Sequence, residues 1–216
     1  MFHVKHKITQ SNVSRETLEL VESQKTLFSE QFERFASLIL EWNKKINLVS
    51  RDIKKDELLN HIHHSLLIQY SKIWHSNYNR VIDAGSGGGL PGVPLSIVSN
   101  NEFLLVDIVE KKMLALNQIL KALKLSNSNS FHQNISSLKV SQNDIYVSKH
   151  AFKLHDFFKL TGGQSYLGAI FLKGDGFFEE LKSCEEPLDV EYISIDEIHR
   201  DQFYKGKYVI SIKRLN

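Results

Sequence analysis

The chain has 216 residues, of which 42% are hydrophobic and 24% are charged, and its formal net charge is +2. These values are those of an ordinary globular protein with one substantial core and an appendage. No apolar run approaches membrane-spanning length, and the first residues lack the order of a signal peptide, so we expect a cytoplasmic protein without a membrane partner. Cys184 is the only cysteine, which excludes an internal disulfide and a cysteine-based zinc site.

The basic residues are unevenly distributed, although a net charge of +2 is too small by itself to indicate nucleic-acid binding. Clusters at 44–45, 51–55 and 205–214 could contact phosphates, and a solvated face is the simpler interpretation of any one of them. His61 and His64 would share one helical face, but no third ligand is in reach. We therefore predict no metal site.

The N-terminal part of the chain is predicted to be helical. Residues 1–12 are polar and without a period, and we expect a disordered arm there. Helix signals begin at 12–14, and apolar residues at three-and-four spacing over 27–42 predict a long amphipathic helix. A further helical stretch covers 57–73. Together, residues 13–78 are predicted to form an N-terminal helical subdomain.

From residue 79 to residue 216, short apolar strands alternate with helices, which is typical of a parallel α/β sheet. The clearest crossover helix covers 110–124. The last two strands lack a convincing helix between them, which predicts an antiparallel pair that closes the sheet. The seven strands are expected near 80–84, 103–107, 130–132, 144–148, 167–172, 190–195 and 207–213.

The segment after the first of these seven strands carries the most informative pattern of the chain. Gly85, Gly87 and Gly89 permit positive φ and the close approach of a ligand to bare backbone. Pro91 has a φ that suits the first turn of a helix. A strand, an acidic residue, a glycine loop and a helix start in this order indicate a nucleoside-cofactor site. The segment reads Asp83-Ala84-Gly85-Ser86-Gly87-Gly88-Gly89-Leu90-Pro91-Gly92.

Two cofactors suit such a loop, because the glycine spacing also fits the dinucleotide fingerprint. Asp83, two residues before Gly85, would repel a pyrophosphate and suits the cationic S-adenosylmethionine, which carries a sulfonium and an ammonium. Asp107, at the end of the next strand, could accept hydrogen bonds from the ribose hydroxyls of either cofactor. An ordinary glycine-rich turn with two unrelated acids is the remaining interpretation.

Six segments occur together in an order and spacing that are specific as a set, although each is a weak motif alone. They are Glu41 to Ser50, His61 to Leu66, Asp83 to Pro94, Leu105 to Asp107, Val147 to Lys149 and Leu172 to Gly174. On these segments the chain resembles the RsmG (GidB) family of bacterial 16S rRNA guanine-N7 methyltransferases over most of residues 12–213. The resemblance implies an α/β, Rossmann-like S-adenosylmethionine-dependent methyltransferase fold with an N-terminal helical extension.

The resemblance also implies the reaction and its site. The substrate would be guanine 527 in a loop of 16S rRNA, free or in the small ribosomal subunit, and the enzyme would act as a monomer. The cofactor residues would be Asp83, Gly85, Gly87, Gly89, Leu90, Asp107, Ile135 and Ser136, and the RNA residues would be Lys149, Lys173, His61, Asn43, Asn47 and Lys207. The chain departs from the family pattern at Asn134, Lys149 and Lys207, where arginine is usual, and at His64, where aspartate is usual.

Guanine N7 carries a free lone pair, so its methylation needs no general base, and we predict no catalytic acid or base. The chain also lacks the Asn/Asp-Pro-Pro-aromatic and Pro-Cys motifs of other base methylations. Because the product base is cationic, we assign Lys149 and Lys173 to phosphate or guanine O6 rather than to the methyl-transfer line. Asn43, Asn47 and His61 could frame the base pocket, or serve only as caps and packing residues.

Three alternatives to this function remain at the level of sequence. A nicotinamide oxidoreductase would share the glycine loop and Asp107. A non-catalytic rRNA-binding or ribosome assembly factor could use the same fold. A methyltransferase could also act on a protein or a small molecule.

Overall fold

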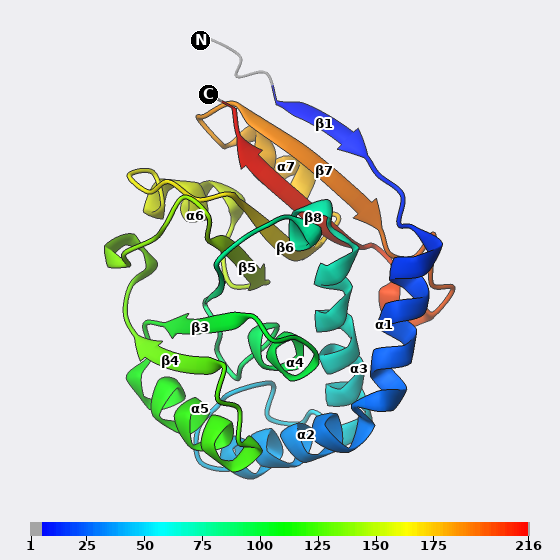
Figure 1. The fold of residues 1–216 in the computed structure, drawn as a ribbon, viewed down its shortest axis with the longest axis vertical. Coiled ribbons are helices and arrows are strands. Elements are labelled where there is room, and N and C mark those ends of the chain that lie inside the picture. The colour runs from blue at the N-terminus through cyan, green and yellow to red at the C-terminus, as the bar shows by residue number, and fades with distance from the viewer. Residues whose placement is uncertain (1–5, 216) are drawn as a thin grey trace.

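The alternating strands and helices of the chain form one eight-stranded sheet that is covered by helices on both faces (Figure 1). This computed structural model describes residues 6–215. The strands are β1 (Lys7–Gln10), β2 (Arg80–Ala84), β3 (Glu102–Asp107), β4 (Ser128–His132), β5 (Ile145–Lys149), β6 (Gly168–Gly174), β7 (Leu188–Ser194) and β8 (Lys207–Arg214). The α-helices are α1 (Arg15–Leu27), α2 (Ser29–Asn43), α3 (Lys55–Leu66), α4 (Gly92–Val98), α5 (Glu110–Leu123), α6 (Leu154–Leu160) and α7 (Phe177–Lys182). Four 3-10 helices are η1 (Leu67–Tyr70), η2 (Lys72–His75), η3 (Ile135–Ser137) and η4 (Gln202–Tyr204).

The strand order is β1-β7-β8-β6-β5-β2-β3-β4. In the described sheet β8 runs antiparallel to β6 and β7, and the other neighbouring strands are parallel. A mostly parallel sheet with an antiparallel pair at its end is the predicted layout. The seven predicted strands correspond to β2–β8 within a few residues, and β1 is an addition to them.

Alternate residues of the strands face two separate hydrophobic clusters. Val81 and Leu105 belong to the cluster on one face, and Ile82 and Leu104 belong to the cluster on the other. Since helices cover both faces, the central strands are buried on both sides, which explains their nearly continuous apolar sequences. This alternation also fixes the face of each polar residue at a strand end.

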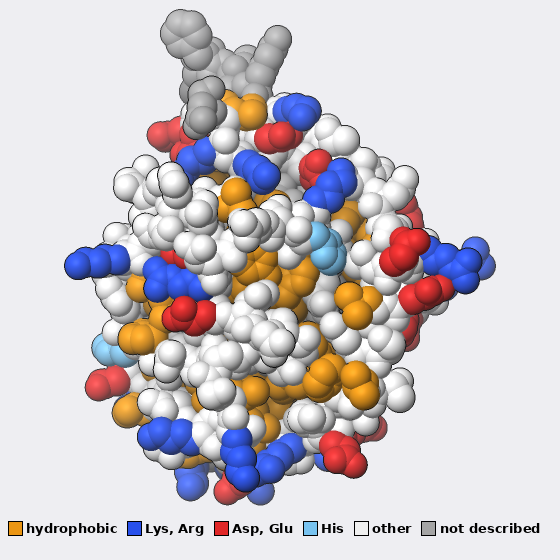
Figure 2. Space-filling model, viewed as in Figure 1, with side chains coloured by type: hydrophobic (Ala, Val, Ile, Leu, Met, Phe, Trp, Pro, Cys, Tyr) orange, Lys and Arg blue, Asp and Glu red, His pale blue; other side chains and the backbone are white. Residues whose placement is uncertain are grey.

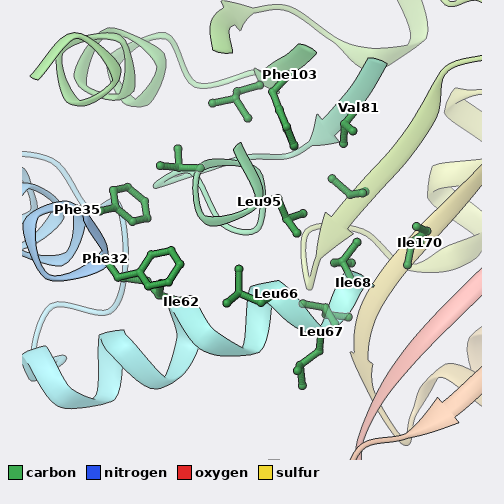
Figure 3. Packing of buried hydrophobic residues seen from close by; sticks show 14 of the residues in the cluster. Phe32, Phe35, Ile62, Leu66, Leu67, Ile68, Val81, Leu95, Phe103 and Ile170 are labelled. Atoms are coloured by element: carbon green, nitrogen blue, oxygen red, sulfur yellow. The ribbon is translucent and has the colours of Figure 1, made fainter. Parts of the chain in front are cut away.

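Helices α2 to α5 share one face of the sheet, and α6 and α7 lie on the other (Figure 1). Figure 3 shows Phe32 of α2, Ile62 and Leu66 of α3 and Leu95 of α4 pointing into one core together with Phe103 of β3. The helices of residues 13–78 therefore complete a layer of the sheet and share its core. An amphipathic helix needs a partner for its apolar stripe, and the sheet face supplies it.

The predicted helices agree with the structure at their starts and differ at two other points. Ser14 caps α1 by accepting a hydrogen bond from the Thr17 backbone N–H at 3.2 Å. The amphipathic pattern of 27–42 corresponds to α2, which Phe28 separates from α1. The helix predicted over 57–73 ends at Leu66 and continues as η1 and η2, since Ser71 caps η2 and bonds Ser211 Oγ at 2.6 Å.

Strand β1 corrects the expectation of a disordered arm over residues 1–12. It pairs in parallel with β7, and Lys7 lies opposite Asp189, with its ammonium 3.3 Å from that carboxylate. The Ser11 backbone N–H donates to the Tyr192 carbonyl at 2.9 Å. Pairing with an open sheet edge uses backbone groups, so a strand can form there without an apolar pattern. The rest of the arm, residues 1–5, lies outside the described residues.

Charged side chains of both signs are interspersed around the face seen in Figure 2, and apolar side chains are visible near its centre. This distribution agrees with the small net charge of +2. In the part of the chain that the structure describes, no helix has the length and apolarity needed to cross a membrane.

Candidate functional site

The loop between β2 and α4 curls over the end of β3. The backbone N–H groups of Gly85 and Ser86 both donate to the Val106 carbonyl, at 2.8 and 3.0 Å. Gly85, Gly87 and Gly89 have φ values of 70°, 53° and 92°, a region that L side chains rarely adopt. The three glycines thus have the predicted backbone conformation, and helix α4 begins at Gly92, directly after Pro91.

Asp83 lies beneath this loop and is fully buried. Its Oδ2 accepts a hydrogen bond from the Gly92 backbone N–H at 2.9 Å, and its Oδ1 has no partner among the described residues. Burial raises the pKa of this carboxyl to about 7, against the opposing effect of the Gly92 hydrogen bond. The carboxylate faces α4, because the strand alternation places it on the same face as Val81. Asp83 does not line the cleft described below, and its effect on a cationic ligand stays a prediction.

Asp107 connects the end of β3 to the glycine loop. Its Oδ2 accepts from the Gly87 backbone N–H at 3.0 Å, and its Oδ1 accepts from the Val109 N–H at 2.9 Å. The carboxylate therefore holds the loop at the edge where β2 and β3 end. Each carboxylate oxygen has two lone pairs, so both oxygens can still accept a bond from a ligand hydroxyl.

A cleft of about 340 Å³ opens at this edge of the sheet. Of the predicted cofactor residues, Gly85, Gly87, Asp107 and Ile135 line it. Of its other walls, Lys149 was predicted as an RNA residue, and the rest were not predicted as site residues. These walls are formed by Val106, Ile108, Lys112, Gln133, Asn134, Lys149, Ala151, Phe152 and Leu160. Val106 and Ile108 flank the predicted acid Asp107, and this position in the sequence could have signalled them.

The remaining predicted cofactor residues do not line the cleft. A Cβ on Gly89 would lie 2.7 Å from Val93 and 2.9 Å from Leu116, so this glycine is required by helix packing. Ser136 is exposed, and its backbone N–H bonds the Asn134 side chain at 3.0 Å. Leu90 lines a second cavity, on the other side of the loop.

This second cavity has a volume of about 310 Å³ and lies between the N-terminal helices and the glycine loop. Its walls are formed by Leu48, Val49, Ser50, Ile53, His61, Gly85, Ser86, Gly87, Gly88, Leu90, Lys149 and His150. Gly85, Gly87 and Lys149 line both cavities. The two cavities are therefore neighbours that meet at the glycine loop and at the end of β5.

Lys149 and His61 come together at this junction. The Lys149 ammonium lies 3.1 Å from His61 Nδ1 and donates to the His61 carbonyl at 3.2 Å. Burial, with the nearby charge of Lys207, lowers the pKa of Lys149 to about 7. Burial also lowers the pKa of His61 to about 4, assisted by Lys149 and Lys207. Three of the predicted RNA residues, His61, Lys149 and Lys207, are thus close in space.

The other predicted RNA residues have structural partners. Asn43 accepts from the backbone N–H groups of Leu48 and Val49 at 2.8 and 3.0 Å, so it shapes the wall of the second cavity from behind. Asn47 is exposed and accepts from the Arg51 side chain at 3.1 Å. Lys173 is 6% exposed.

The Lys173 ammonium lies 2.5 Å from Glu180 Oε2 and donates to the Phe152 carbonyl at 2.6 Å. The predicted contact of this lysine with RNA is therefore not supported, since a carboxylate neutralises it and two of its three N–H donors are used inside the protein. Among residues 6–215, no group of three or more His, Cys, Asp or Glu side chains could hold a metal ion.

Known proteins of one family match this chain. The model of the GidB family, described as rRNA small subunit methyltransferase G, matches residues 28–202. The chain belongs to the GidB family. A protein of Chlorobium limicola named ribosomal RNA small subunit methyltransferase G is 32% identical to it, over 93% of each chain. A protein of the same name from Flavobacterium psychrophilum is 32% identical over 84% of this chain and 89% of its own.

A solved structure agrees with the fold. A point mutant of MtNAS in complex with S-adenosylmethionine has a TM-score of 0.60 at 10% identity, over 93% of this chain and 78% of that one. At this identity the likeness concerns the fold alone, and it confirms the predicted Rossmann-like α/β class. The GidB match confirms the predicted family and removes the nicotinamide oxidoreductase alternative.

Proposed function

We propose that the chain transfers a methyl group from S-adenosylmethionine to N7 of a guanine in small-subunit rRNA, at the position numbered 527 in 16S rRNA. The observation that carries this proposal is the pair of adjoining cavities in a chain of the GidB family. One cavity adjoins the glycine loop and Asp107, and the other opens between that loop and the N-terminal helices. A two-substrate transfer needs this arrangement, because donor and acceptor must meet at one point.

The first cleft fits a nucleoside cofactor. Its volume of about 340 Å³ is in the range of small-molecule sites. A Cβ on Gly87 would meet only backbone oxygens, at 3.9 Å, so bare backbone faces open space there. Asp107 would hold the ribose hydroxyls, while Ile108 and Ile135 would provide apolar walls for the adenine ring. S-adenosylmethionine, when bound, supplies an electrophilic methyl group on a sulfonium sulfur.

The second cavity fits an unpaired base. Leu48, Val49 and Leu90 provide apolar walls, and His61 and Lys149 provide polar groups at one end. A guanine inside a duplex could not enter this space, so the target must be unpaired or turned out of the stack. Because guanine N7 has a free lone pair, no residue has to remove a proton. The walls would act by aligning N7 and excluding water, an effect that contributes on the order of 7–11 kcal/mol in favourable cases.

We infer that the partner is 16S rRNA, free or within the small ribosomal subunit, and that the chain acts as a monomer in the cytoplasm. A deciding experiment compares small-subunit rRNA from cells with and without this gene by cleavage specific for N7-methylguanine. We expect one cleavage site to disappear when the gene is deleted and to return with the wild-type gene. An unchanged cleavage pattern would contradict the proposal.

Purified protein separates catalysis from RNA binding alone. Incubation with radiolabelled S-adenosylmethionine and unmethylated small-subunit rRNA, or whole subunits, should label one guanine. Asp107→Ala removes the proposed ribose ligand and should abolish labelling, whereas Lys159→Ala, an exposed lysine on α6, should not. Binding of RNA without labelling by the wild type would instead indicate a non-catalytic assembly factor.

A further inference from the structure

Basic side chains from three distant segments gather at one end of the second cavity. His61 and His64 come from α3, Lys149 and His150 from the end of β5, and Lys207 from the start of β8. We call these five residues the basic cluster. His61 and His150 line the cavity beside Lys149. The structure thus concentrates cationic and titratable groups where the substrate would enter.

Phe203 connects the two lysines of the basic cluster. Its ring lies edge-on to His61, with ring centroids 5.2 Å apart, and the Lys207 ammonium lies 3.3 Å from the centre of its ring. The same lysine donates to the Phe203 carbonyl. An aromatic face holds a cation without neutralising it, so Lys207 keeps its charge available.

The lysines of the basic cluster have no carboxylate partner within the described residues. Lys173 shows the contrasting case, since Glu180 neutralises it inside the protein. The hydrogen bonds of the Lys149 ammonium within the described residues go to the His61 ring and carbonyl. A partly buried cation without a counterion is costly, and proteins normally pair such groups. The basic cluster therefore lacks a negative charge that would balance its two lysines.

His64 belongs to the same cluster but does not line the cavity. Its side chain is fully buried, and neither ring nitrogen has a hydrogen-bond partner among residues 6–215. A neutral imidazole carries one N–H donor, so a buried donor here has no acceptor. The ring packs 6.5 Å from His150 and 5.9 Å from Phe203, between centroids, directly within the basic cluster.

We propose that the basic cluster binds one phosphate group of the RNA substrate, between α3 and the ends of β5 and β8. This inference rests on the proposed function, because it takes RNA as the substrate. A phosphate supplies acceptor oxygens for Lys149 and for the N–H groups of His61 and His150, which line the cavity, and a negative charge for the lysines. The neutral O6 of guanine supplies an acceptor and no charge, so it would not satisfy the cluster.

Phosphate binding at this site takes up protons. Burial and Lys207 lower the pKa of Lys149 to about 7, and desolvation and Lys149 lower the pKa of His150 to about 4. The groups that face Lys149 and His150 are His61 and His64 from α3, Lys207 from β8, and Lys173 with Glu180 from β6 and α7. An arriving phosphate raises the pKa of Lys149, so the bound form holds a proton that the free form has partly lost above pH 7.

The sign of the pH dependence follows from this linkage. RNA affinity is highest where free Lys149 is already protonated, and it falls as the pH rises through the pKa of the free protein. For a free pKa of about 7 and a bound pKa well above 8.5, the affinity falls about sevenfold between pH 7.5 and 8.5. An arginine at this position keeps its charge at every pH in this range.

The test measures binding of unmethylated small-subunit rRNA transcript at pH 7.5 and 8.5 and constant ionic strength. We expect the dissociation constant to rise about sevenfold for the wild type and less than twofold for Lys149→Arg. Lys159→Arg, the same change at an exposed position on α6, should behave as the wild type. Lys149→Met should bind weakly at both pH values, and circular dichroism checks that both Lys149 variants fold.

Calorimetry in buffers of different ionisation enthalpy gives a second readout. At pH 8 the wild type should take up about one proton on binding the transcript, and Lys149→Arg should take up none. Equal pH sensitivity in the wild type and Lys149→Arg would overturn the phosphate site. So would the same proton uptake with S-adenosylmethionine alone, because the anion would then be the cofactor carboxylate.

The methylation assay separates this inference from the proposed function. RNA labelling by the wild type together with a flat pH dependence of binding contradicts only the phosphate site. A transcript that is neither bound nor labelled at any pH contradicts both.

Discussion

Gly87 and Gly92, five residues apart in the same loop, are required for different reasons. A Cβ on Gly92 would lie 2.2 Å from a Leu105 methyl and 2.6 Å from Asp83 Oδ2, both of which belong to the sheet. A Cβ on Gly87 would have space around it, but its φ of 53° is unfavourable for an L residue. Gly92 therefore serves packing, and Gly87 serves the cleft.

Alanine substitutions should separate these two requirements. Gly92→Ala should destabilise the fold by about 2 kcal/mol or more, because rigid neighbours must move. Gly87→Ala should cost about 1 kcal/mol of stability and should weaken S-adenosylmethionine binding through its place in the cleft wall. Urea unfolding and calorimetric titration measure the two effects. Equal stabilities of the two variants would contradict this distinction.

Lys173 and Glu180 form a buried pair whose role is structural. The side chains are only 7% and 23% exposed, and Glu180 also accepts from the Leu154 backbone N–H at 2.8 Å. Lys173→Met should leave the Glu180 charge uncompensated and lower the free energy of unfolding by about 3 kcal/mol. The double variant with Glu180→Met should recover much of this loss.

RNA binding distinguishes this structural role from the RNA contact that the sequence suggested. The salt dependence of RNA affinity should be the same for the double variant as for the wild type, since neither residue neutralises a phosphate. A shallower slope would show that Lys173 does contact RNA.

Strand β1 is the element of the fold that the sequence did not predict. Its four residues are exposed, and it forms the outer edge of the sheet beside β7. Four strands, β7, β8, β6 and β5, separate it from β2 and the glycine loop. Its contribution is therefore expected at the sheet edge and not at the site.

Removal of residues 1–11 should expose the edge of β7 and increase self-association, because an open edge offers unpaired backbone groups to another chain. Methylation of rRNA should persist in the monomeric fraction. Light scattering and the labelling assay measure the two properties. A monodisperse variant, or a loss of methylation in its monomers, would contradict this assignment.

The elements that carry the site were largely predictable. Parallel strands end at one edge of a sheet, and this brings together Gly85, Asp107 and Lys149, three predicted site residues that follow or end such strands. Phe152 and Gln133 were not expected, because they lie on connecting segments whose course no local pattern determines. The direction of the Asp83 side chain and the need for a glycine at position 89 were also not predictable, because both depend on packing against α4 and α5.

At the scale of the whole molecule, buried histidines determine the response to acid. Burial lowers the pKa of His64 well below its usual value and that of His61 to about 4, and desolvation lowers the pKa of His63 and His199. The unfolded chain therefore binds more protons than the folded chain between about pH 4 and 6.5. Asp83, whose pKa is raised, binds a proton in the folded chain and has the opposite effect, but it is a single group against several histidines.

The melting temperature should accordingly rise as the pH increases from about 4.5 to about 6.5, because stability rises wherever the unfolded state binds more protons. His64→Asn removes one of these groups and should give a flatter profile. Scanning calorimetry across this range provides the measurement. A melting temperature that is constant or falls with pH would contradict the assigned directions.

The sequence by itself determined the positions of strands β2 to β8 along the chain and the strand-loop-helix around Gly85, because these are recorded in local patterns of apolar residues and glycines. Its motif segments, taken together, indicated the family. Tertiary structure alone decided which way Asp83 faces, that Glu180 neutralises Lys173, and that the basic cluster forms. His61 and Lys149 are 88 residues apart, and their 3.1 Å contact exists only because α3 packs across the ends of the strands. Contacts at such separations depend on how elements pack, which no local pattern records.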